Sequence, residues 1–373
     1  MRRRQSPHAD SLPISLDAAT APCNDSPMAS SAGDPGKASK STNQVPLSVA
    51  LARSRLRRYP AQLIDSILRG STSPSTPNTP AASSSLPADA ILLDPARAAQ
   101  PAPHFPRTFD HSLARGPLSA AWLGHASTLL RIADRWVLTD PVFSQRIGVS
   151  LGALTLGVAR QGPTFDPAHL PHIDLILLSH AHFDHLDKPT LRRLASPSTR
   201  VVTAANTRRL IPDGFGDVRE LHWGQELRIG PLLLRALRPE HWGARTAWDT
   251  HRGYNAYVLE ADAARQHRAR VLFAGDTAHS EVFESLAQAG GVDLSIFGIG
   301  AYDPWIAKHA TPEQVWAMHT AAGGRHLLPM HHSTFELSDE PMDEPMRRLL
   351  AAAGQSESSI VARQLGEMWS MGA

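Results

Sequence analysis

"LLSHAHFDHLD", residues 177–187, decides both the fold and the chemistry that this sequence predicts. Its three histidines and two aspartates follow directly on the apolar run "IDLILL", which is typical of a buried strand. His180 and His182 alternate along the chain, so both can point to one centre while Asp184 and His185 reach a second. We therefore expect the stretch to hold two adjacent metal ions at the end of a strand.

Three more ligand-type residues follow other apolar runs. His241 comes after "PLLLRAL", Asp276 after "ARVLFA" and His331 after "HLLPM". Because the carboxyl ends of neighbouring strands meet at one edge of a sheet, we expect these side chains to join the first cluster. Imidazole and carboxylate groups suit zinc, and a carboxylate can bridge two ions. Two zinc ions lower the pKa of a shared water, so the pattern indicates a hydrolase.

Short apolar runs separated by turns predict an α/β fold. The expected strands are 118–123, 127–132, 135–139, 173–178, 200–204, 231–237, 255–260, 269–274, 293–299 and 326–330, and the expected helices are 188–195, 280–289, 311–322 and 343–353. A tight hairpin is expected at Ala133 and Asp134. The order begins as a strand meander and then alternates strand and helix, which two sheets with helices on their outer faces would accommodate.

The composition narrows the classes of function. Lysine and arginine (37) nearly balance aspartate and glutamate (35), so no global charge indicates a nucleic-acid partner. The single cysteine, Cys23, excludes internal disulfides and thiolate-rich zinc sites. No run reaches the roughly 18 apolar residues of a membrane span, and the first residues lack the apolar core of a signal peptide. We expect a cytoplasmic protein, with contact at the inner membrane surface if its substrate is a lipid.

The chain is expected to have two parts. Residues 1–90 are rich in Ser, Pro and Ala and are expected to be mostly disordered, with a Ser/Pro linker at 71–88. A short helix at 47–69, broken at Pro60, carries four arginines that either face water or contact a membrane surface. Residues 105–370 are expected to form the hydrolase domain.

"HAHFDH" is the HxHxDH signature of the metallo-beta-lactamase superfamily, which this chain resembles. The resemblance implies a four-layer αβ/βα sandwich of two mixed sheets with outer helices. Within the superfamily the chain is similar to the branch that contains N-acylphosphatidylethanolamine-hydrolysing phospholipase D. The matching segments are "WLGHAST" (122–128), "VLTDPVFSQR" (137–146), "HWGART" (241–246), "FAGDT" (273–277), "IGAYDPW" (299–305), "KHATPEQ" (308–314) and "MHHSTF" (330–335).

The resemblance also assigns roles to individual residues. It implies that His180, His182 and His241 hold one zinc ion. It implies that Asp184, His185 and His331 hold the other and that Asp276 bridges the two. Asp184 and His309 are the candidate catalytic residues, with His309 binding a substrate phosphate oxygen or assisting proton transfer. Asp140 and His125 are expected to support the ligands from behind.

Two features depart from the family or leave alternatives open. The family commonly reads His-Trp-Gly-Thr-Phe where this chain has residues 331–335, His-His-Ser-Thr-Phe, which alters the expected wall beside the second metal and makes His332 an alternative ligand. The apolar segment 147–158 is either a lipid-facing loop or a buried lid. Tyr302 and Trp305 either line a substrate pocket or pack in the core.

The expected activity is hydrolysis of a phosphodiester, with a small molecule or a phospholipid such as an N-acylphosphatidylethanolamine as substrate. A lactonase or phosphate-ester hydrolase related to L-ascorbate-6-phosphate lactonase is the enzymatic alternative. A metal-binding regulatory protein is the alternative without turnover. A redox di-iron protein is disfavoured because such relatives usually have Glu where His182 stands. The sequence makes no prediction of oligomeric state.

Overall fold

The structure, a computed structural model, describes residues 114, 116–151, 154–246, 248–261 and 269–372. The expected disordered tail, the linker, the helix at 47–69 and the start of the hydrolase domain at residue 105 lie outside the described residues. Within the described part of the chain, no helix has both the length and the apolar character needed to cross a membrane.

Seven strands of the described chain form the first sheet, in the order β15-β1-β2-β3-β6-β7-β8. They are β1 (Leu118–Trp122), β2 (Thr128–Ile132), β3 (Arg135–Thr139), β6 (Leu175–Leu178), β7 (Arg200–Ala204), β8 (Asp217–Leu221) and β15 (Met368–Ser370). The pairs from β15 to β3 are antiparallel, and those from β3 to β8 are parallel. The expected hairpin joins β2 to β3, with left-handed φ angles of 50° at Ala133 and 58° at Asp134.

The second sheet contains six strands of the described chain, in the order β14-β13-β12-β11-β10-β9. They are β9 (Glu226–Ile229), β10 (Leu232–Leu237), β11 (Ala256–Ala261), β12 (Arg270–Phe273), β13 (Val292–Gly298) and β14 (Gly324–Met330). This sheet is also mixed, because β9 to β12 pair antiparallel while β12, β13 and β14 pair parallel. Parallel strands bring their carboxyl ends to one edge, which is where ligand-type residues were expected.

The apolar segment 147–158, expected as a lipid-facing loop or a buried lid, lies in a two-stranded hairpin. Strands β4 (Arg146–Leu151) and β5 (Leu154–Ala159) pair antiparallel along their whole length. Ile147 and Val158 belong to a small apolar cluster with Phe335 and Leu337, which anchors the base of the hairpin to the domain.

Each helix lies between two strands in the sequence. They are α4 (Lys188–Leu194), α5 (Ser285–Gln288), α6 (Pro312–Ala321) and α7 (Glu344–Ala353), with 3₁₀ turns η3 (Pro167–His169), η4 (Arg208–Leu210), η5 (Glu281–Phe283) and η6 (Gly354–Ser359). A capping box begins α6, because Thr311 and Gln314 each bond the backbone N–H of the other. The helix expected at 280–289 is divided into η5 and α5.

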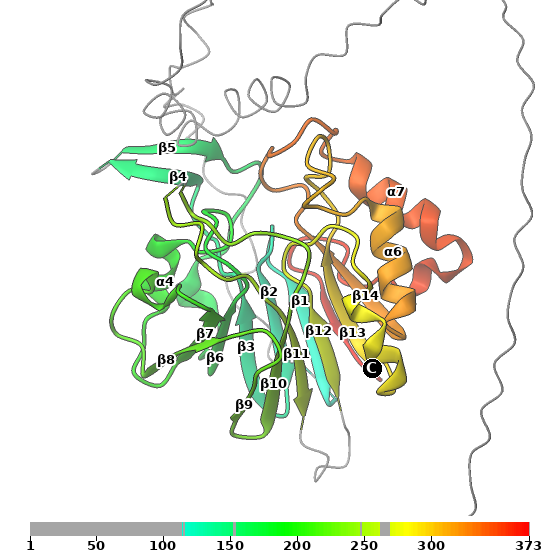
Figure 1. The fold of residues 1–373 in the computed structure, drawn as a ribbon, viewed down its shortest axis with the longest axis horizontal. Helices are drawn as coiled ribbons and strands as arrows, with labels where there is room; N and C mark the ends of the chain where they lie inside the picture. Colours follow the sequence, from blue (N-terminus) through cyan, green and yellow to red (C-terminus); the bar gives the residue numbers. More distant parts are fainter. Residues whose placement is uncertain (1–113, 115, 152–153, 247, 262–268, 373) are drawn as a thin grey trace, which may run out of the picture. The chain divides into compact units, whose positions relative to one another are not determined.

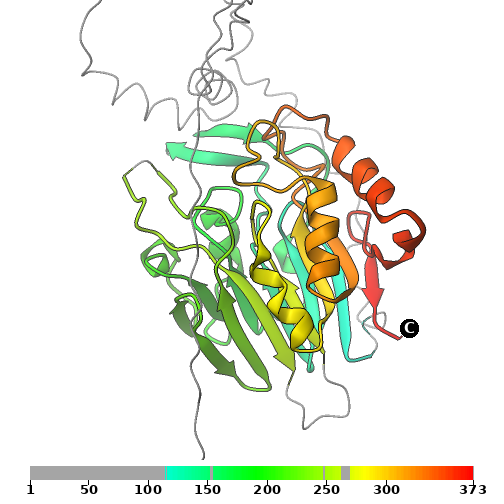
Figure 2. The ribbon, with the colours of Figure 1, turned by 45° about the vertical axis from the view of Figure 1, so that its right-hand side comes forward.

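The elements form four layers (Figure 1). The core between the sheets contains side chains of one face of each, such as Leu130 and Val202 from the first sheet and Leu234 and Leu294 from the second. The outer face of the first sheet packs against α4, and that of the second against α5, α6 and α7. Figure 2 shows these three helices covering the second sheet. The predicted αβ/βα sandwich is therefore confirmed.

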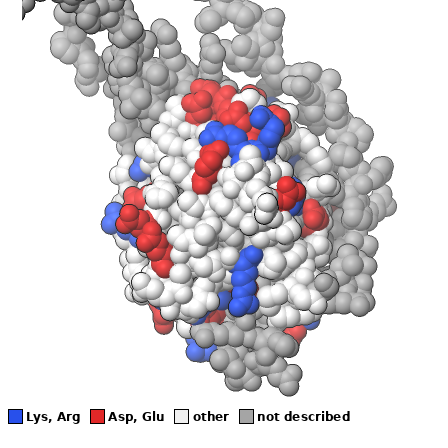
Figure 3. All heavy atoms as spheres, turned by 90° about the vertical axis from the view of Figure 1, so that its right-hand side faces the viewer, with Lys and Arg blue, Asp and Glu red and all other residues white. Residues whose placement is uncertain are grey.

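Charged side chains of both signs gather at the top of the face that carries α6 and α7 (Figure 3). Arg348 of α7 lies 2.7 Å from the carboxylate of Glu313 on α6 and 3.1 Å from that of Glu344 one turn before it. The ion pair with Glu313 links α6 to α7, whose apolar side chains also pack together.

Candidate metal centre

Every predicted ligand lies at the end of a strand, and the structure brings all seven together. The side chains follow β6, β10, β12 and β14, whose carboxyl ends share one edge of the two sheets. Their ligand-type atoms fall into groups that each span no more than 4.8 Å. One group contains His180, His182, His241 and Asp276, and a second contains His125, Asp184, His185 and His331.

The first group is built around the HxH pair and the β10 histidine. Nε2 of His180 lies 2.8 Å from Nδ1 of His182, and Nε2 of His241 lies 3.4 Å from the same Nδ1. Behind the group, Nδ1 of His241 donates to the carbonyl oxygen of Lys308 at 2.9 Å, which turns Nε2 toward the other two rings. Three imidazole nitrogens therefore converge as the predicted first zinc site requires.

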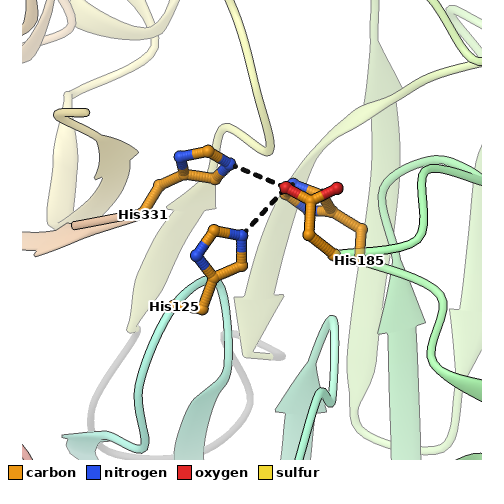
Figure 4. A group of neighbouring side chains, drawn as sticks. His125, His185 and His331 are labelled. Carbon is orange, nitrogen blue, oxygen red and sulfur yellow. Dashed lines mark hydrogen bonds and ion pairs between the residues drawn. The ribbon is translucent and has the colours of Figure 1, made fainter. Parts of the chain in front are cut away.

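The second group surrounds the carboxylate of Asp184. Its Oδ2 lies 3.2 Å from Nε2 of His331 and 3.5 Å from Nε2 of His185. Nε2 of His125 lies 3.0 Å from the same oxygen. Figure 4 shows the rings of His125 and His331 turned toward one carboxylate beside His185. His125 thus stands within the ligand group itself, closer than the supporting position expected for it.

Asp276 faces both groups with a single oxygen. Its Oδ2 lies 3.0 Å from Nε2 of His185 and 3.3 Å from Nε2 of His331 in the second group. The same oxygen lies 3.7 Å from Nε2 of His241 and 3.9 Å from Nε2 of His180 in the first group. This is the position that a bridging carboxylate must occupy.

Among the seven predicted ligands, two buried atoms lack a hydrogen-bond partner in the described part of the chain: Asp276 Oδ1 and His185 Nε2. Unpaired buried polar atoms are costly and are rare in folded proteins. A divalent cation between the two groups would satisfy them, and the nitrogen and oxygen donors suit zinc or iron. The residues of the centre therefore fit the two metal ions that the sequence predicts.

Asp140 holds the second group from behind. Its Oδ2 accepts a hydrogen bond from Nδ1 of His185 at 2.6 Å, and its Oδ1 accepts one from the backbone N–H of Ser179 at 2.7 Å. The hydroxyl of Ser179 also lies 2.9 Å from Nδ1 of His180. That hydroxyl donates to Oδ2 of Asp140 at 2.5 Å, so Asp140 contacts the ring of His185 directly and that of His180 through Ser179.

Burial keeps most of the imidazoles of the centre neutral. It lowers the pKa of His182 to about 4 and the pKa of His241 to about 3, and it holds the pKa of His180 well below the usual range. A neutral imidazole presents a lone pair to a metal ion, whereas a protonated imidazole repels it. The first group therefore offers three ready donors.

In the second group, the carboxylates raise the pKa of two imidazoles and so favour their protonated form. Burial alone would lower the pKa of His331, but the Asp276 and Asp184 carboxylates outweigh it and raise the pKa to about 9. Burial also lowers the pKa of His185, but nearby carboxylates outweigh it and raise that pKa, with Asp276 contributing most. The two carboxylates thus attract positive charge to the space between them, which is what a divalent cation supplies.

His309 stands at the more exposed side of the centre. Its Nδ1 lies 3.9 Å from Oδ2 of Asp276, and its ring centroid lies 5.1 Å from that of His241 and 5.2 Å from that of His331. The side chain therefore contacts both ligand groups, as the expectation of a histidine beside the metals requires.

His332 is turned away from the metal groups. Its ring stacks on Trp122 at a centroid distance of 4.4 Å and, with Trp122 and Ser333, lines a cavity of about 810 Å³. The alternative that His332 is the ligand is therefore wrong in its geometry, since His331 occupies the group. The departure at His332 and Ser333 therefore lies in the wall of this cavity and not in the groups of ligand-type residues.

Three residues of the centre have left-handed backbone conformations: His125 (φ 50°), Asp140 (φ 30°) and His331 (φ 61°). Such conformations are costly for residues other than glycine and gather at functional sites.

Tyr302 is buried and donates its hydroxyl proton to Glu344 at 2.9 Å, so this aromatic ring belongs to the packing.

Sequence reasoning missed Arg245, which reaches the metal-ligand loop. Its Nη1 donates to the carbonyl oxygens of Ala181 and Leu186 at 2.9 and 2.8 Å. The only sequence signal was its place in the family-like segment "HWGART", four residues after His241.

Comparison with known proteins agrees with this geometry. The family described as "Beta-lactamase superfamily domain" matches residues 135–332, more than half of the chain. The chain belongs to this family. The match covers the ligand loop and extends through β14 to His331 and His332. The predicted membership of the metallo-beta-lactamase superfamily is therefore confirmed.

Proteins similar to this chain align with most of its length. An uncharacterized protein of Mycobacterium tuberculosis is 32% identical over 268 residues, which are 67% of this chain and 68% of the relative. N-acyl-phosphatidylethanolamine-hydrolyzing phospholipase D 1 of Caenorhabditis elegans is 27% identical over 308 residues, which are 76% of this chain and 83% of the relative. The solved structure of CmlA, a diiron beta-hydroxylase from Streptomyces venezuelae, shares the fold, with a TM-score of 0.50, 21% identity and coverage of 69% of this chain and 55% of CmlA.

Proposed function

We propose that this member of the superfamily is a dinuclear zinc phosphodiesterase that hydrolyses N-acylphosphatidylethanolamine or a closely related diester. The observation that carries the proposal is the position of Asp276, whose Oδ2 lies 3.0 to 3.9 Å from imidazole nitrogens of both ligand groups. A shared carboxylate of this kind serves a pair of ions rather than a single ion.

The residues of each group would hold one ion, with Asp276 common to both. His180, His182 and His241 would bind the first, and Asp184, His185 and His331 the second. Two zinc ions bound there would lower the pKa of a water molecule and neutralise charge that develops on the phosphate oxygens.

His309 is the group best placed to contact the substrate. Hydrolysis adds the oxygen of water to phosphorus, breaks the P–O bond to the ethanolamine oxygen and leaves that oxygen in need of a proton. His309, beside both ligand groups, would bind a phosphate oxygen or deliver this proton. Asp184 would contribute as a ligand of the second ion.

The substrate class is supported by the relatives and by motifs outside the ligand set. The C. elegans relative is a phospholipase D that hydrolyses N-acyl-phosphatidylethanolamine, and it aligns with 76% of this chain. The segments "HWGART" and "KHATPEQ", on which the branch resemblance rests, contribute His241 and His309 to the groups of ligand-type residues. Because such a diester lies in a bilayer, the proposal includes contact between the protein and a membrane surface.

Metal counting and hydrolysis together test the proposal. Purified protein is expected to contain two zinc ions per chain and to cleave both bis(p-nitrophenyl) phosphate and N-acylphosphatidylethanolamine in vesicles. Asp276→Asn is expected to lose bound metal and to lower the rate about 100-fold or more. Asp213→Asn, at an exposed position away from the centre, is the matched control.

Other outcomes would contradict defined parts of the proposal. Two irons, as in diiron CmlA, would overturn the metal assignment. Bound zinc without cleavage of either diester would overturn the phosphodiesterase assignment and favour a lactone or a phosphate monoester as substrate. Protein that binds no metal at all would overturn the whole proposal.

A further inference from the structure

Arg245 contacts the metal-ligand loop at three points. Its Nη1 donates to the carbonyl oxygens of Ala181 and Leu186 at 2.9 and 2.8 Å, and its guanidinium lies over the ring of Phe183, 3.9 Å from the centroid. Planar stacking combined with directed hydrogen bonds is specific to arginine, because the ammonium group of lysine has neither the plane nor the fork.

The two accepting carbonyls enclose the ligands of the loop. His182, Asp184 and His185 all lie between Ala181 and Leu186. Within the loop, the backbone N–H groups of His185 and Leu186 both bond to the carbonyl oxygen of His182, which closes a single turn outside any strand. Ala181 and Leu186 are fully buried, so their carbonyl oxygens lie in the interior. Without the guanidinium of Arg245 these oxygens would lose their donor, which is costly for a buried carbonyl group.

Arg245 keeps its charge although its side chain is largely buried. Burial lowers its pKa to about 10, and the Asp187 and Asp249 carboxylates oppose that shift. The guanidinium therefore remains protonated at neutral pH. Arg245 belongs to the segment that begins with His241. This one short segment therefore supplies a predicted ligand to the first group and a side chain that supports the loop 181–186, whose predicted ligands belong to both groups.

We propose that Arg245 is a positioning residue that holds the ligand loop 181–186 in its metal-binding conformation before any metal binds. The inference rests on the proposed metal centre, but the brace is a property of the chain itself. Loss of a partner that orients metal ligands typically lowers metal affinity about 10- to 100-fold. The same loss is expected to leave the loop free to open in the metal-free protein.

Arg160 provides a matched control. It donates to the carbonyl oxygens of Val142 and Ser144 at 2.6 and 3.1 Å and lies 4.7 Å from the centroid of the Phe335 ring. Burial lowers its pKa to about 10, as for Arg245. Arg160 therefore makes the same kinds of contact to a loop that carries none of the seven predicted ligands.

Hydrogen exchange of the metal-free protein tests the brace directly. In Arg245→Met, amides of peptides covering 181–187 are expected to exchange about tenfold faster or more, whereas Arg160→Met is expected to leave those peptides unchanged. Arg245→Lys keeps the charge and serves if the methionine variant fails to fold. Unchanged exchange at 181–187 in the folded Arg245 variant would overturn the proposal.

Zinc affinity, measured by competition with a chelator, separates positioning from simple stability. Arg245→Lys is expected to weaken zinc binding about 10- to 100-fold relative to Arg160→Lys. Faster exchange with unaltered zinc affinity would also overturn the proposal, because Arg245 would then be only structural. Neither readout uses hydrolysis, so failure of the proposed phosphodiesterase activity would leave this inference to be judged on its own results.

Discussion

Asp140 and His185 are joined by a 2.6 Å contact between Oδ2 and Nδ1, and both side chains are fully buried. The aspartate comes directly after β3 and the histidine follows β6, the strand paired beside β3 in the first sheet. The contact fixes which ring nitrogen of His185 faces Asp276 and the metal groups. A ligand is thus oriented by a neighbouring strand end, independently of the loop that carries it.

Replacing Asp140 by asparagine is expected to weaken metal binding. The amide of Asp140→Asn keeps the shape of the side chain but cannot accept the Nδ1 proton with a full negative charge. We expect zinc affinity to fall about 10- to 100-fold, measured by chelator competition. Asp213→Asn should have no effect. Unaltered affinity in Asp140→Asn would show that the ring of His185 is oriented by other contacts.

Substitutions at His331 and His332 are expected to have opposite effects on metal content. His332→Phe keeps an aromatic ring against Trp122, so the protein should retain two metal ions per chain. His331→Gln removes the Nε2 atom that lies 3.2 Å from Asp184 and should lose at least one ion. Elemental analysis of both variants measures this difference. Loss of metal in His332→Phe with retention in His331→Gln would reverse the assignment.

The sequence shows which residues should lie close together at the site, because strand ends are visible in it. His241, Asp276 and His331 each follow an apolar run, and parallel strands must bring such residues to one edge. The choice between His331 and His332 could not be made in the same way, because both follow β14. In the structure His331 has a left-handed φ of 61°, and no local pattern encodes that angle.

The elements that sequence reading missed are those with weak apolar patterns. Strand β8, "DVREL", and strand β9, "ELRI", lie at sheet edges with mostly half-buried or exposed side chains, so neither shows a clear buried face. The β4–β5 hairpin was visible as an apolar segment, but its pairing was not. The brace from Arg245 depends on contacts about 60 residues apart in sequence, which a single sequence does not reveal.

Gly275 is expected to be indispensable beside Asp276. Its φ is +60°, and an added Cβ would lie 2.8 Å from Cβ of Ser179, the residue that bonds Asp140. Gly230 has a similar φ of +55° but open space around it, so Gly230→Ala isolates the backbone cost of about 1 kcal/mol. Gly275→Ala should lower the free energy of unfolding more and should also weaken zinc binding. Equal destabilisation of the two variants would contradict the steric argument.

The ion pair between Glu313 and Arg348 is expected to contribute little to the free energy of unfolding at neutral pH and nothing in acid. The hydrogen bond from Arg348 lowers the pKa of Glu313 to about 2, so the contribution is present above pH 4.5 and is lost as pH falls toward 2. Because the pair is exposed, Glu313→Gln should cost less than about 1 kcal/mol and less still in high salt. Denaturant titrations at two salt concentrations measure the effect. A salt-independent loss would indicate packing rather than charge.

His319 of α6 is expected to make stability depend on pH away from the metal centre. Burial lowers its pKa from 6.5 to about 4, and Nδ1 lies 2.7 Å from the hydroxyl of Ser295. Between pH 6.5 and 4 the unfolded chain binds a proton there that the folded chain excludes. The stability that the neutral His319 imidazole contributes to the folded protein is therefore fully present above pH 6.5 and is lost as pH falls to about 4.

Urea unfolding of wild type and His319→Gln across this range tests the sign. The variant should be less stable at pH 7, and the gap should narrow by up to about 3 kcal/mol on acidification. Ser295→Ala removes the hydrogen bond but leaves the imidazole buried, so its pH slope should remain that of the wild type. A gap that widens in acid would mean that the folded protein stabilises the protonated imidazole, contrary to the burial that dominates its surroundings.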